Sequence, residues 1–395
     1  MVAKNLGAKL AETVLGHGDQ DRATHTDISN PDREGGQYAD LSGEKMKAMV
    51  WMAKNDMRIV EASKPTLVDD HDVIVRVTGS TVCGSDVHLM HGVVVQVEKG
   101  DILGHEFCSI VDTVGPAVSH LKVGERVVNS FVVSCGECSF CKQNLTTACE
   151  RTNASTVQEM LYGSRTGGIF GYSHFTGGYA GGQAEYVRVP IGEQSLLKLP
   201  GSVPDEKGLY LSDVLPTSYH SVSDTGVYEG DCVAIWGLGP MGLMACFWAF
   251  RKGAKRVIDI DKNWRTEYAK SKIPGLETIN FSGGEYVKSW THRVELSLSL
   301  EQDISEMVNE CIMSTRKFGR VGIIADYTGY WKELLQLVES GQVDPTIMLT
   351  HRITMDDIAK SYYAQEKQSN GLVKCYVETR FSAPRAEGTQ ELTSL

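Results

Sequence analysis

The sequence predicts an α/β plus β chain, in which an all-β region comes first and a helix-covered parallel sheet follows. Short β-branched runs separated by glycines and polar turns occupy residues 73–82, 108–114, 126–133 and 184–190. From about Leu209, strand and helix signals alternate, which is typical of a parallel sheet with crossover helices. Within residues 233–261, a glycine-rich turn joins a buried strand to an apolar helix.

Composition sets the broad class of protein. The chain has 395 residues, enough for two domains with hydrophobic cores. Its hydrophobic content of 42% and charged content of 23% are those of an ordinary soluble globular protein. The formal net charge of −11 argues against a nucleic-acid partner, because phosphate binding needs clustered lysines and arginines.

The two ends of the chain lack an apolar period. Residues 1–45 are polar and predict a disordered N-terminal tail, and residues 381–395 predict a disordered C-terminal tail. The start has no long apolar core, so we expect no secretory signal and a cytoplasmic location. A mitochondrial presequence is the less favoured alternative, because Glu12 and further acidic residues follow.

Four cysteines lie close together within the all-β region. Three of them are separated by two residues each and the fourth follows after seven more. Four thiolates on one Zn²⁺ would give this short loop the core that its few apolar residues cannot supply. Two disulfides or four free thiols are the alternatives. The candidate ligands of a structural zinc are Cys135, Cys138, Cys141 and Cys149.

The glycine-rich turn has the parts of a dinucleotide-binding unit. A buried strand precedes it, an apolar helix follows it, and Asp261 lies 19 residues after Gly242, where a carboxylate would take the ribose hydroxyls. The helix N-terminus would face the phosphates. The alternative is a tight strand-to-helix turn in an unrelated α/β domain. The candidate nucleotide-binding residues are Gly237, Leu238, Gly239, Pro240, Met241, Gly242 and Asp261.

The same motif bears on two further questions. Asp261 would repel a 2′-phosphate, so NAD is favoured over NADP, although Lys262 and Arg265 soften that preference. The uncharged run 232–250 is as long as a membrane span, but its three glycines and proline fit the nucleotide turn better. We therefore expect no membrane partner.

Two earlier stretches carry reactive side chains. Residues 82–92 contain Cys83, Ser85 and His88, and residues 104–107 contain His105 and Glu106. Taken singly, a cysteine is more often a core residue and a His-Glu pair is more often a surface pair than a metal site.

Together with the cysteine loop and the nucleotide motif, these stretches resemble the zinc-dependent medium-chain alcohol dehydrogenase family. The resemblance runs from about Lys47 to Arg380. It implies a GroES-like β-barrel catalytic domain and a Rossmann cofactor domain. It also implies two zinc ions per chain, NAD, and dimers or tetramers. Cys83 and His105 would bind the catalytic zinc, and the four-cysteine loop would bind the structural one.

The third catalytic ligand implied by the resemblance is Asp213. Many members have cysteine there, whereas the branch that resembles glutathione-independent formaldehyde dehydrogenase has aspartate. From the residues alone, Asp213 would be a helix cap or turn acid. Glu106 would be an alternate ligand or would lie beside the metal. Ser85 would accept the proton of a bound alcohol and pass it to His88; a turn serine and a polar cleft-edge histidine are the alternatives.

The expected domains follow from these assignments. After the tail 1–45 come the catalytic domain 46–213 with its zinc lobe 135–149, the cofactor domain 214–345, and a return segment 346–380. The cofactor domain is shorter than in the family by two helix–strand units, one missing after Ser282 and one after Tyr330. A parallel crossover needs a dozen or more residues, and neither gap leaves room for one.

Two functions are therefore predicted. The first is a zinc-dependent oxidoreductase that transfers a hydride between an alcohol or hydrated aldehyde and NAD. The second is a catalytically impaired zinc-binding relative that lacks part of the cofactor domain. A nucleic-acid zinc ribbon is a third class, which the acidic balance disfavours.

Overall fold

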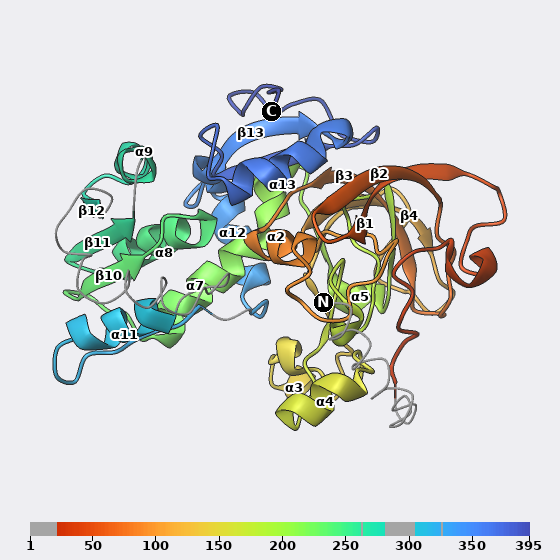
Figure 1. Ribbon diagram of the computed structural model, residues 1–395, viewed down its shortest axis with the longest axis horizontal. Coiled ribbons are helices and arrows are strands. Elements are labelled where there is room, and N and C mark those ends of the chain that lie inside the picture. The colour runs from red at the N-terminus through yellow and green to blue at the C-terminus, as the bar shows by residue number, and fades with distance from the viewer. Residues whose placement is uncertain (1–21, 262–263, 281–304, 325–326) are drawn as a thin grey trace. The chain divides into compact units, whose positions relative to one another are not determined.

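The structure is a computed structural model that describes residues 22–261, 264–280, 305–324 and 327–395. The chain forms two compact units (Figure 1). The first unit combines residues 1–213 with residues 327–395, and the second unit is residues 214–326.

A seven-stranded sheet forms the centre of the first unit, in the order β13-β14-β3-β4-β5-β9, with β8 paired to β3. Apart from the parallel pair β13–β14, its neighbouring strands are antiparallel. Alternating valines of β3 pack with Phe107 and Phe170 in one hydrophobic core. The strands of this sheet are β3 (Val73–Ser80), β4 (Phe107–Val114), β5 (Arg126–Asn129), β8 (Tyr186–Val189), β9 (Leu196–Lys198), β13 (Leu349–Thr354) and β14 (Lys374–Glu378).

Shorter elements surround this sheet. The hairpin β1–β2 packs with the sheet strands, and α13 packs on α2. The remaining strands of the unit are β1 (Lys45–Ala53), β2 (Asp56–Ser63), β6 (Val132–Val133) and β7 (Gly168–Ile169). Its helices are η1 (Arg33–Gly36), α2 (Gly84–Met90), α3 (Ser139–Lys142), η2 (Thr146–Ala148), α4 (Thr156–Tyr162), η3 (His174–Thr176), α5 (Gly192–Ser195), α6 (Asp205–Gly208), η4 (Leu209–Leu211), α12 (Trp331–Glu339), η6 (Pro345–Met348), η7 (Met355–Asp357) and α13 (Ile358–Glu366).

The structure corrects the prediction for residues 22–45. We expected a disordered tail, but this segment is bonded to the first unit. The amide of Asp27 donates to Gly177 O at 2.9 Å, and Ser29 O accepts from the amide of Ile102 at 3.1 Å. Ile28 and Ser29 are buried. The polar composition suggested a solvated tail, but Thr24 Oγ1 accepts from Arg188 at 3.1 Å and Ser29 Oγ donates to Asp101 at 2.7 Å, and both charged residues are buried. The rest of the predicted tail, residues 1–21, lies outside the described residues.

The C-terminal segment also differs from the prediction. Its residue Thr393 donates its amide to Arg352 O at 2.7 Å, and Leu395 packs against the core that α2 and α13 share. Leu392 also forms an isolated bridge with Arg352 of β13, so the end of this segment lies against the first unit.

One domain boundary was misplaced. We assigned residues 327–345 to the cofactor domain, but the structure groups them with the first unit. The reason is α12, which buries Leu334 and Val338 and packs against α6 and η4.

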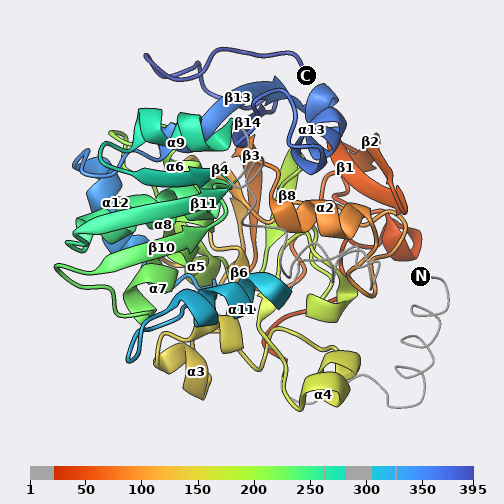
Figure 2. The ribbon, with the colours of Figure 1, turned by 60° about the vertical axis from the view of Figure 1, so that its left-hand side comes forward.

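The second unit holds a parallel sheet in the order β10-β11-β12. Helix α8 lies along β10 and β11 (Figure 2) and packs against α7, where Trp248 Nε1 donates to Ser218 Oγ at 3.0 Å. The elements are α7 (Val214–Asp224), β10 (Cys232–Trp236), α8 (Pro240–Arg251), β11 (Arg256–Asp261), α9 (Arg265–Lys272), β12 (Glu277–Asn280) and α11 (Ser305–Ser314).

Strand β10 is poorly covered for a strand of a parallel sheet. Each of its residues is half-buried or exposed, whereas such strands are normally buried on both faces. Within the described part of the chain, β10 has a ladder partner on one side, β11. This exposure fits the predicted shortening of the cofactor domain. The first predicted gap, after Ser282, falls outside the described residues.

The uncharged run 232–250 forms β10, the glycine turn and most of α8. Among the described helices, none is both long enough and apolar enough to cross a membrane.

Candidate active site and metal centres

The predicted catalytic ligands lie in three turns of the first unit. Cys83 is the N-cap residue of α2, and its amide donates to Asp86 Oδ2 at 2.8 Å in a capping-box arrangement. His105 and Glu106 directly precede β4, and Asp213 directly precedes α7. The backbone positions of all four residues are therefore set by the first residues of α2, β4 and α7.

The four side chains meet in one cluster, in which Cys83 is half-buried and the other three are buried. Each of Cys83, His105, Glu106 and Asp213 offers one ligand atom, and these atoms lie within 4.8 Å of one another. His105 Nε2 is 3.4 Å from Asp213 Oδ2 and 3.9 Å from Glu106 Oε1. One sulfur, one imidazole and carboxylate oxygens form a set that Zn²⁺ prefers.

One buried oxygen of the cluster has unmet bonding capacity, which suits a cation. Among the described residues, Glu106 Oε2 has no hydrogen-bond partner, and neither have His105 Nδ1 and Asp86 Oδ1, which face each other. Burial alone would lower the pKa of His105, but hydrogen bonds to Asp213 and Cys83 outweigh burial and raise it. Acidic groups that hold a proton on a buried imidazole would equally hold a metal ion in its place.

The two nitrogens of His105 face different partners. Nε2 faces the carboxylates of Asp213 and Glu106, whereas Nδ1 faces Asp86 Oδ1 at 3.7 Å. Asp86 is buried and also accepts from Gln183 Nε2 at 3.1 Å. A carboxylate behind a ligating histidine fixes the ring and raises its basicity.

Lys374 is a site residue that the sequence analysis missed. Its Nζ lies 2.5 Å from Glu106 Oε1, and both side chains are only 1% exposed. Burial lowers the pKa of Lys374, but the charge of Glu106 outweighs burial and raises it. The available signal was a lysine inside the apolar strand β14, where a charge needs a partner.

Glycines let the backbone leading to His105 pack without side chains. Gly104 has φ +96°, and a Cβ there would lie 2.4 Å from Gln183 Cγ. A Cβ on Gly171 would lie 2.4 Å from Gly104 N, and one on Gly181 would lie 2.3 Å from Leu103 O. The main chain on either side therefore fixes the path of the loop.

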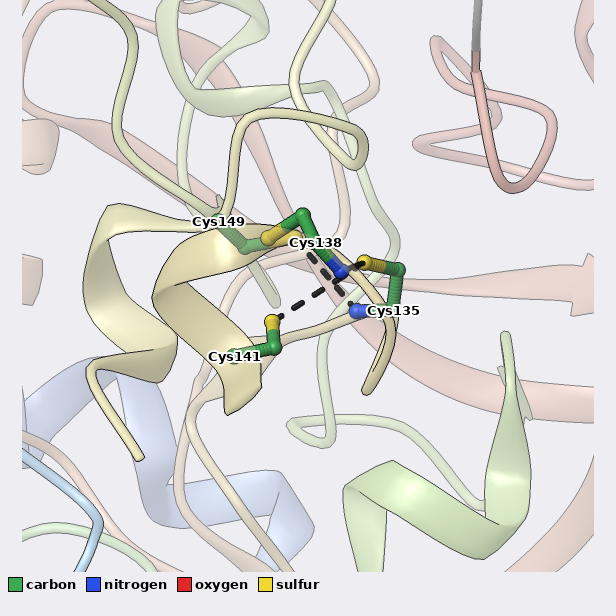
Figure 3. Close-up of side chains that lie close together, drawn as sticks. All are labelled: Cys135, Cys138, Cys141 and Cys149. Carbon is green, nitrogen blue, oxygen red and sulfur yellow. Dashed lines mark hydrogen bonds between the residues drawn. The ribbon is translucent and has the colours of Figure 1, made fainter. Parts of the chain in front are cut away.

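The four predicted structural ligands also lie together, as Figure 3 shows. Cys135 Sγ is 3.9 Å from Cys141 Sγ. That separation is close to the edge of a tetrahedron with Zn–S bonds of 2.3 Å, about 3.8 Å, and far longer than a disulfide bond of about 2.05 Å. Cys135, Cys138, Cys141 and Cys149 form no disulfide in this structure, which excludes that alternative here.

Backbone amides point at these sulfurs. Cys135 Sγ accepts from the amides of Glu137 at 3.4 Å and Cys138 at 3.3 Å, and Cys149 Sγ accepts from Cys135 N at 3.4 Å. Burial would raise the pKa of Cys138, but the backbone amides of Cys141 and Glu150 outweigh it, and the pKa falls to about 7. Amide donors favour thiolates, which are the form that binds zinc.

The second unit places the predicted nucleotide residues at one turn. Gly237 has φ +98°, Gly239 is the N-cap residue of α8, and Pro240 occupies its first turn. A Cβ on Gly242 would lie 1.7 Å from Gly237 O, so only glycine fits there. Asp261, at the end of β11, accepts a hydrogen bond from the amide of Leu238 and so lies at the turn.

Known proteins with similar sequences point to one family. Residues 69–201 match the family model described as the alcohol dehydrogenase GroES-like domain. A zinc-type alcohol dehydrogenase-like protein of Schizosaccharomyces pombe is 37% identical over 95% of this chain and 98% of its own length. The chain belongs to the zinc-dependent medium-chain alcohol dehydrogenase family. The family and the GroES-like plus Rossmann fold predicted from the sequence are thereby confirmed.

Other alcohol dehydrogenase relatives match over shorter stretches. A glutathione-independent formaldehyde dehydrogenase of Pseudomonas aeruginosa is 37% identical over 61% of this chain and 60% of its own length. Among solved structures, an alcohol dehydrogenase from Thermus sp. ATN1 has a TM-score of 0.71 and 27% identity. The match covers 85% of this chain and the whole length of that structure. The chain is thus an oxidoreductase of a zinc family.

The two residues of the predicted proton relay lie on one helix of the dehydrogenase. Ser85 and His88 are three residues apart on α2, directly after Cys83, and both side chains are half-buried. Residues three apart share a helix face. The relay itself stays a prediction.

Substituting Gly242 by alanine tests the nucleotide turn. The new Cβ would collide with Gly237 O, so we expect coenzyme binding to weaken at least about tenfold, which corresponds to 1.4 kcal/mol. Titration of NADH fluorescence measures the dissociation constant. Gly201→Ala is the control, because a Cβ there meets no atom within 4 Å. Wild-type affinity in Gly242→Ala would show that the turn does not bind coenzyme.

Proposed function

We propose that this chain is an NAD-dependent zinc alcohol or aldehyde dehydrogenase, with Cys83, His105 and Asp213 as the ligands of its catalytic zinc. The observation that supports this most is the buried cluster, whose donor atoms lie within 4.8 Å of one another. When bound there, zinc supplies a Lewis acid that lowers the pKa of a substrate hydroxyl, and NAD supplies the hydride acceptor.

Charge balance favours three ligands rather than four. A thiolate at Cys83, a carboxylate at Asp213 and a neutral His105 would cancel the two positive charges of zinc. Glu106 is already neutralised by Lys374 at 2.5 Å. We therefore place Glu106 beside the metal, where its unpartnered Oε2 can serve as a reserve donor.

The proton of the substrate hydroxyl needs a route out of the buried site. Ser85 Oγ would accept it and His88 would take it from Ser85, since an imidazole can both accept and donate a proton. Both side chains are half-buried, in contrast to the buried Asp86 on the same helix. Asp86 instead orients His105, which it faces at 3.7 Å.

The coenzyme would bind at the glycine turn of the second unit. Amides at the start of α8 would face its phosphates, and Asp261 would bind its ribose hydroxyls and disfavour a 2′-phosphate. The chemistry named for the formaldehyde dehydrogenase relative suggests small primary alcohols and hydrated aldehydes as substrates. A homodimer or homotetramer and a cytoplasmic location belong to the same proposal.

One observation favours the impaired relative as a second candidate. Every residue of β10 is half-buried or exposed, and β10 carries the glycine turn at its end. A strand that lacks cover on its faces holds that turn less firmly. Coenzyme binding would suffer first, whereas both zinc sites lie within the first unit.

Zinc analysis combined with a coenzyme assay tests both candidates. We expect purified full-length protein to carry two zinc ions per chain and to form NADH with short primary alcohols or formaldehyde. Two zinc ions without NADH binding or formation would favour the impaired relative. One zinc ion per chain would contradict the proposed catalytic centre, because the cysteine lobe alone would account for it.

A further inference from the structure

Residues 22–33, which we name the N-terminal strap, bond to the segment that leads to His105. Ser29 O accepts from the amide of Ile102 at 3.1 Å, and Asn30 Nδ2 donates to Gly100 O at 2.8 Å. Nothing in the proposed chemistry uses the strap. Its contacts nevertheless reach the backbone only a few residues before a proposed metal ligand.

Asp101 is the centre of these contacts. Its Oδ1 accepts from Ser29 Oγ at 2.7 Å, from Arg33 Nη2 at 2.6 Å, and faces His174 Nε2 at 3.2 Å. Its side chain is only 1% exposed. Asp27, also in the strap, lies 2.9 Å from the other ring nitrogen of His174. The amide of Glu98 donates to Asp101 Oδ2 at 2.7 Å, and a buried carboxylate with four such contacts is strongly fixed, because each lost donor would leave charge less compensated.

The charge on His174 strengthens this centre. Burial alone would lower the pKa of His174, but Asp101 and Asp27 outweigh burial and raise it to about 10. The raised pKa favours a protonated ring between Asp27 and Asp101, and Arg33 pairs with Asp101 and Glu98.

The backbone from Asp101 to His105 has little freedom. Ile102 O accepts from the amide of Gly181 at 2.9 Å, Leu103 O from Gln183 at 3.0 Å, and Gly104 O from Gly182 at 2.7 Å. Ile102 thus bonds to the strap through its amide and to Gly181 through its carbonyl, and the amide of Leu103 donates to Met49 O at 3.3 Å. A shift at Asp101 would therefore be passed along the main chain to His105.

We propose that the N-terminal strap positions His105 for metal binding, with Asp101 as the positioning residue that transmits its contacts. This inference rests on the proposed function, because it presumes a metal ion at His105. It assigns a role to a segment whose sequence is polar and whose residues do not belong to the metal cluster.

Asp69 is a control for Asp101 with the same types of donor, although its side chain is 25% exposed and that of Asp101 is 1% exposed. Asp69 also receives a strap hydroxyl, a histidine ring and an arginine: Thr24 Oγ1 at 2.8 Å, His25 Nδ1 at 2.7 Å and Arg188 Nη2 at 2.9 Å. Asp69, however, lies in the turn before β3 and not in the segment that leads to His105. Replacing either aspartate by asparagine weakens the strap, but only the change at Asp101 touches the proposed route.

The test measures how fast zinc leaves the folded protein. Wild type, Asp101→Asn and Asp69→Asn, all full length and zinc-loaded, are mixed with an excess of a chromophoric chelator. Two phases of release are expected, and Cys83→Ala identifies the catalytic phase by losing it. We expect Asp101→Asn to release catalytic zinc about tenfold faster, the size of effect known for residues that orient metal ligands. Release of structural zinc should not change, and Asp69→Asn should match wild type in both phases.

The remaining outcomes test either the role of the strap or the proposed function. Equal catalytic release in Asp101→Asn and wild type would overturn the inference, as would faster release of both zinc ions to the same extent. A single release phase in wild type would instead contradict the proposed function. If Asp101→Asn does not fold, Ser29→Ala is compared with Thr24→Val, since each removes one buried strap hydroxyl. Faster catalytic release in Ser29→Ala alone supports the strap, and equal release overturns it.

Discussion

Replacing Cys83 by alanine will remove the catalytic zinc and lower activity at least about a thousandfold. The change removes one of the three proposed ligands and leaves His105 and Asp213 without a shared cation. A thousandfold loss corresponds to about 4 kcal/mol of transition-state stabilisation, the several kcal/mol that a Lewis acid supplies. Zinc content should fall from two ions per chain to one, measured by elemental analysis together with the rate of NADH formation.

Cys108→Ser is the control for this experiment. Cys108 is buried in β4, two residues after Glu106, and its Sγ donates only a weak hydrogen bond to Asp205 O at 3.8 Å. This variant should lose some stability but keep both zinc ions. Two zinc ions in Cys83→Ala would exclude Cys83 from the metal centre.

Replacing Cys141 by serine is expected to unfold the zinc lobe, residues 135–149. The lobe has few apolar residues, and metal binding supplies most of the folding free energy of such sites. Loss of about 3–5 kcal/mol would lower the midpoint of thermal unfolding by roughly 10 °C or more in a domain of this size. Circular dichroism measures the midpoint, and limited proteolysis followed by mass spectrometry locates the cleavage.

The effect of Cys141→Ser should extend beyond the lobe itself. Asn144 Nδ2 donates to Gly329 O at 3.1 Å, and Thr146 Oγ1 lies 2.8 Å from Thr328 Oγ1. Residues 328–329 directly precede α12, so we expect new cleavage there as well. Cys232→Ser, which changes an exposed cysteine outside the lobe, should leave cleavage and midpoint unchanged. An unaltered midpoint in Cys141→Ser would contradict a structural zinc.

The sequence was most informative where chemistry is confined to short motifs. Cys135, Cys138 and Cys141 are spaced so closely that one ion can join them whatever the rest of the fold does. The glycines at 237, 239 and 242 are informative for a similar reason, because each meets a local backbone requirement. Cys83 and His105 were harder to assign, since the strand pairing of β3 with β4 brings their turns together. Only the resemblance linked them before the structure did.

What the sequence could not indicate depends on pairs of residues far apart along the chain. Lys374 and Glu106 are 268 positions apart in the sequence, and the residues around each of them do not indicate that the two pair. The strap was read as disordered because its polar residues look solvated until Asp101 and His174 are placed beside them. Residues 327–345 were assigned to the wrong unit because the amphipathic pattern of α12 shows that a face is buried but not what covers it.

The glycines around Gly104 limit which positions of this enzyme can be changed by design. Gly104, Gly171 and Gly181 bring main chain against main chain, with 2.3–2.4 Å to the nearest atom for any added methyl group. A library that randomises these positions would lose most of its members to misfolding before selection for a new substrate could act. Diversity is better introduced at other positions, and these three glycines should be kept because they hold the backbone next to His105 in place.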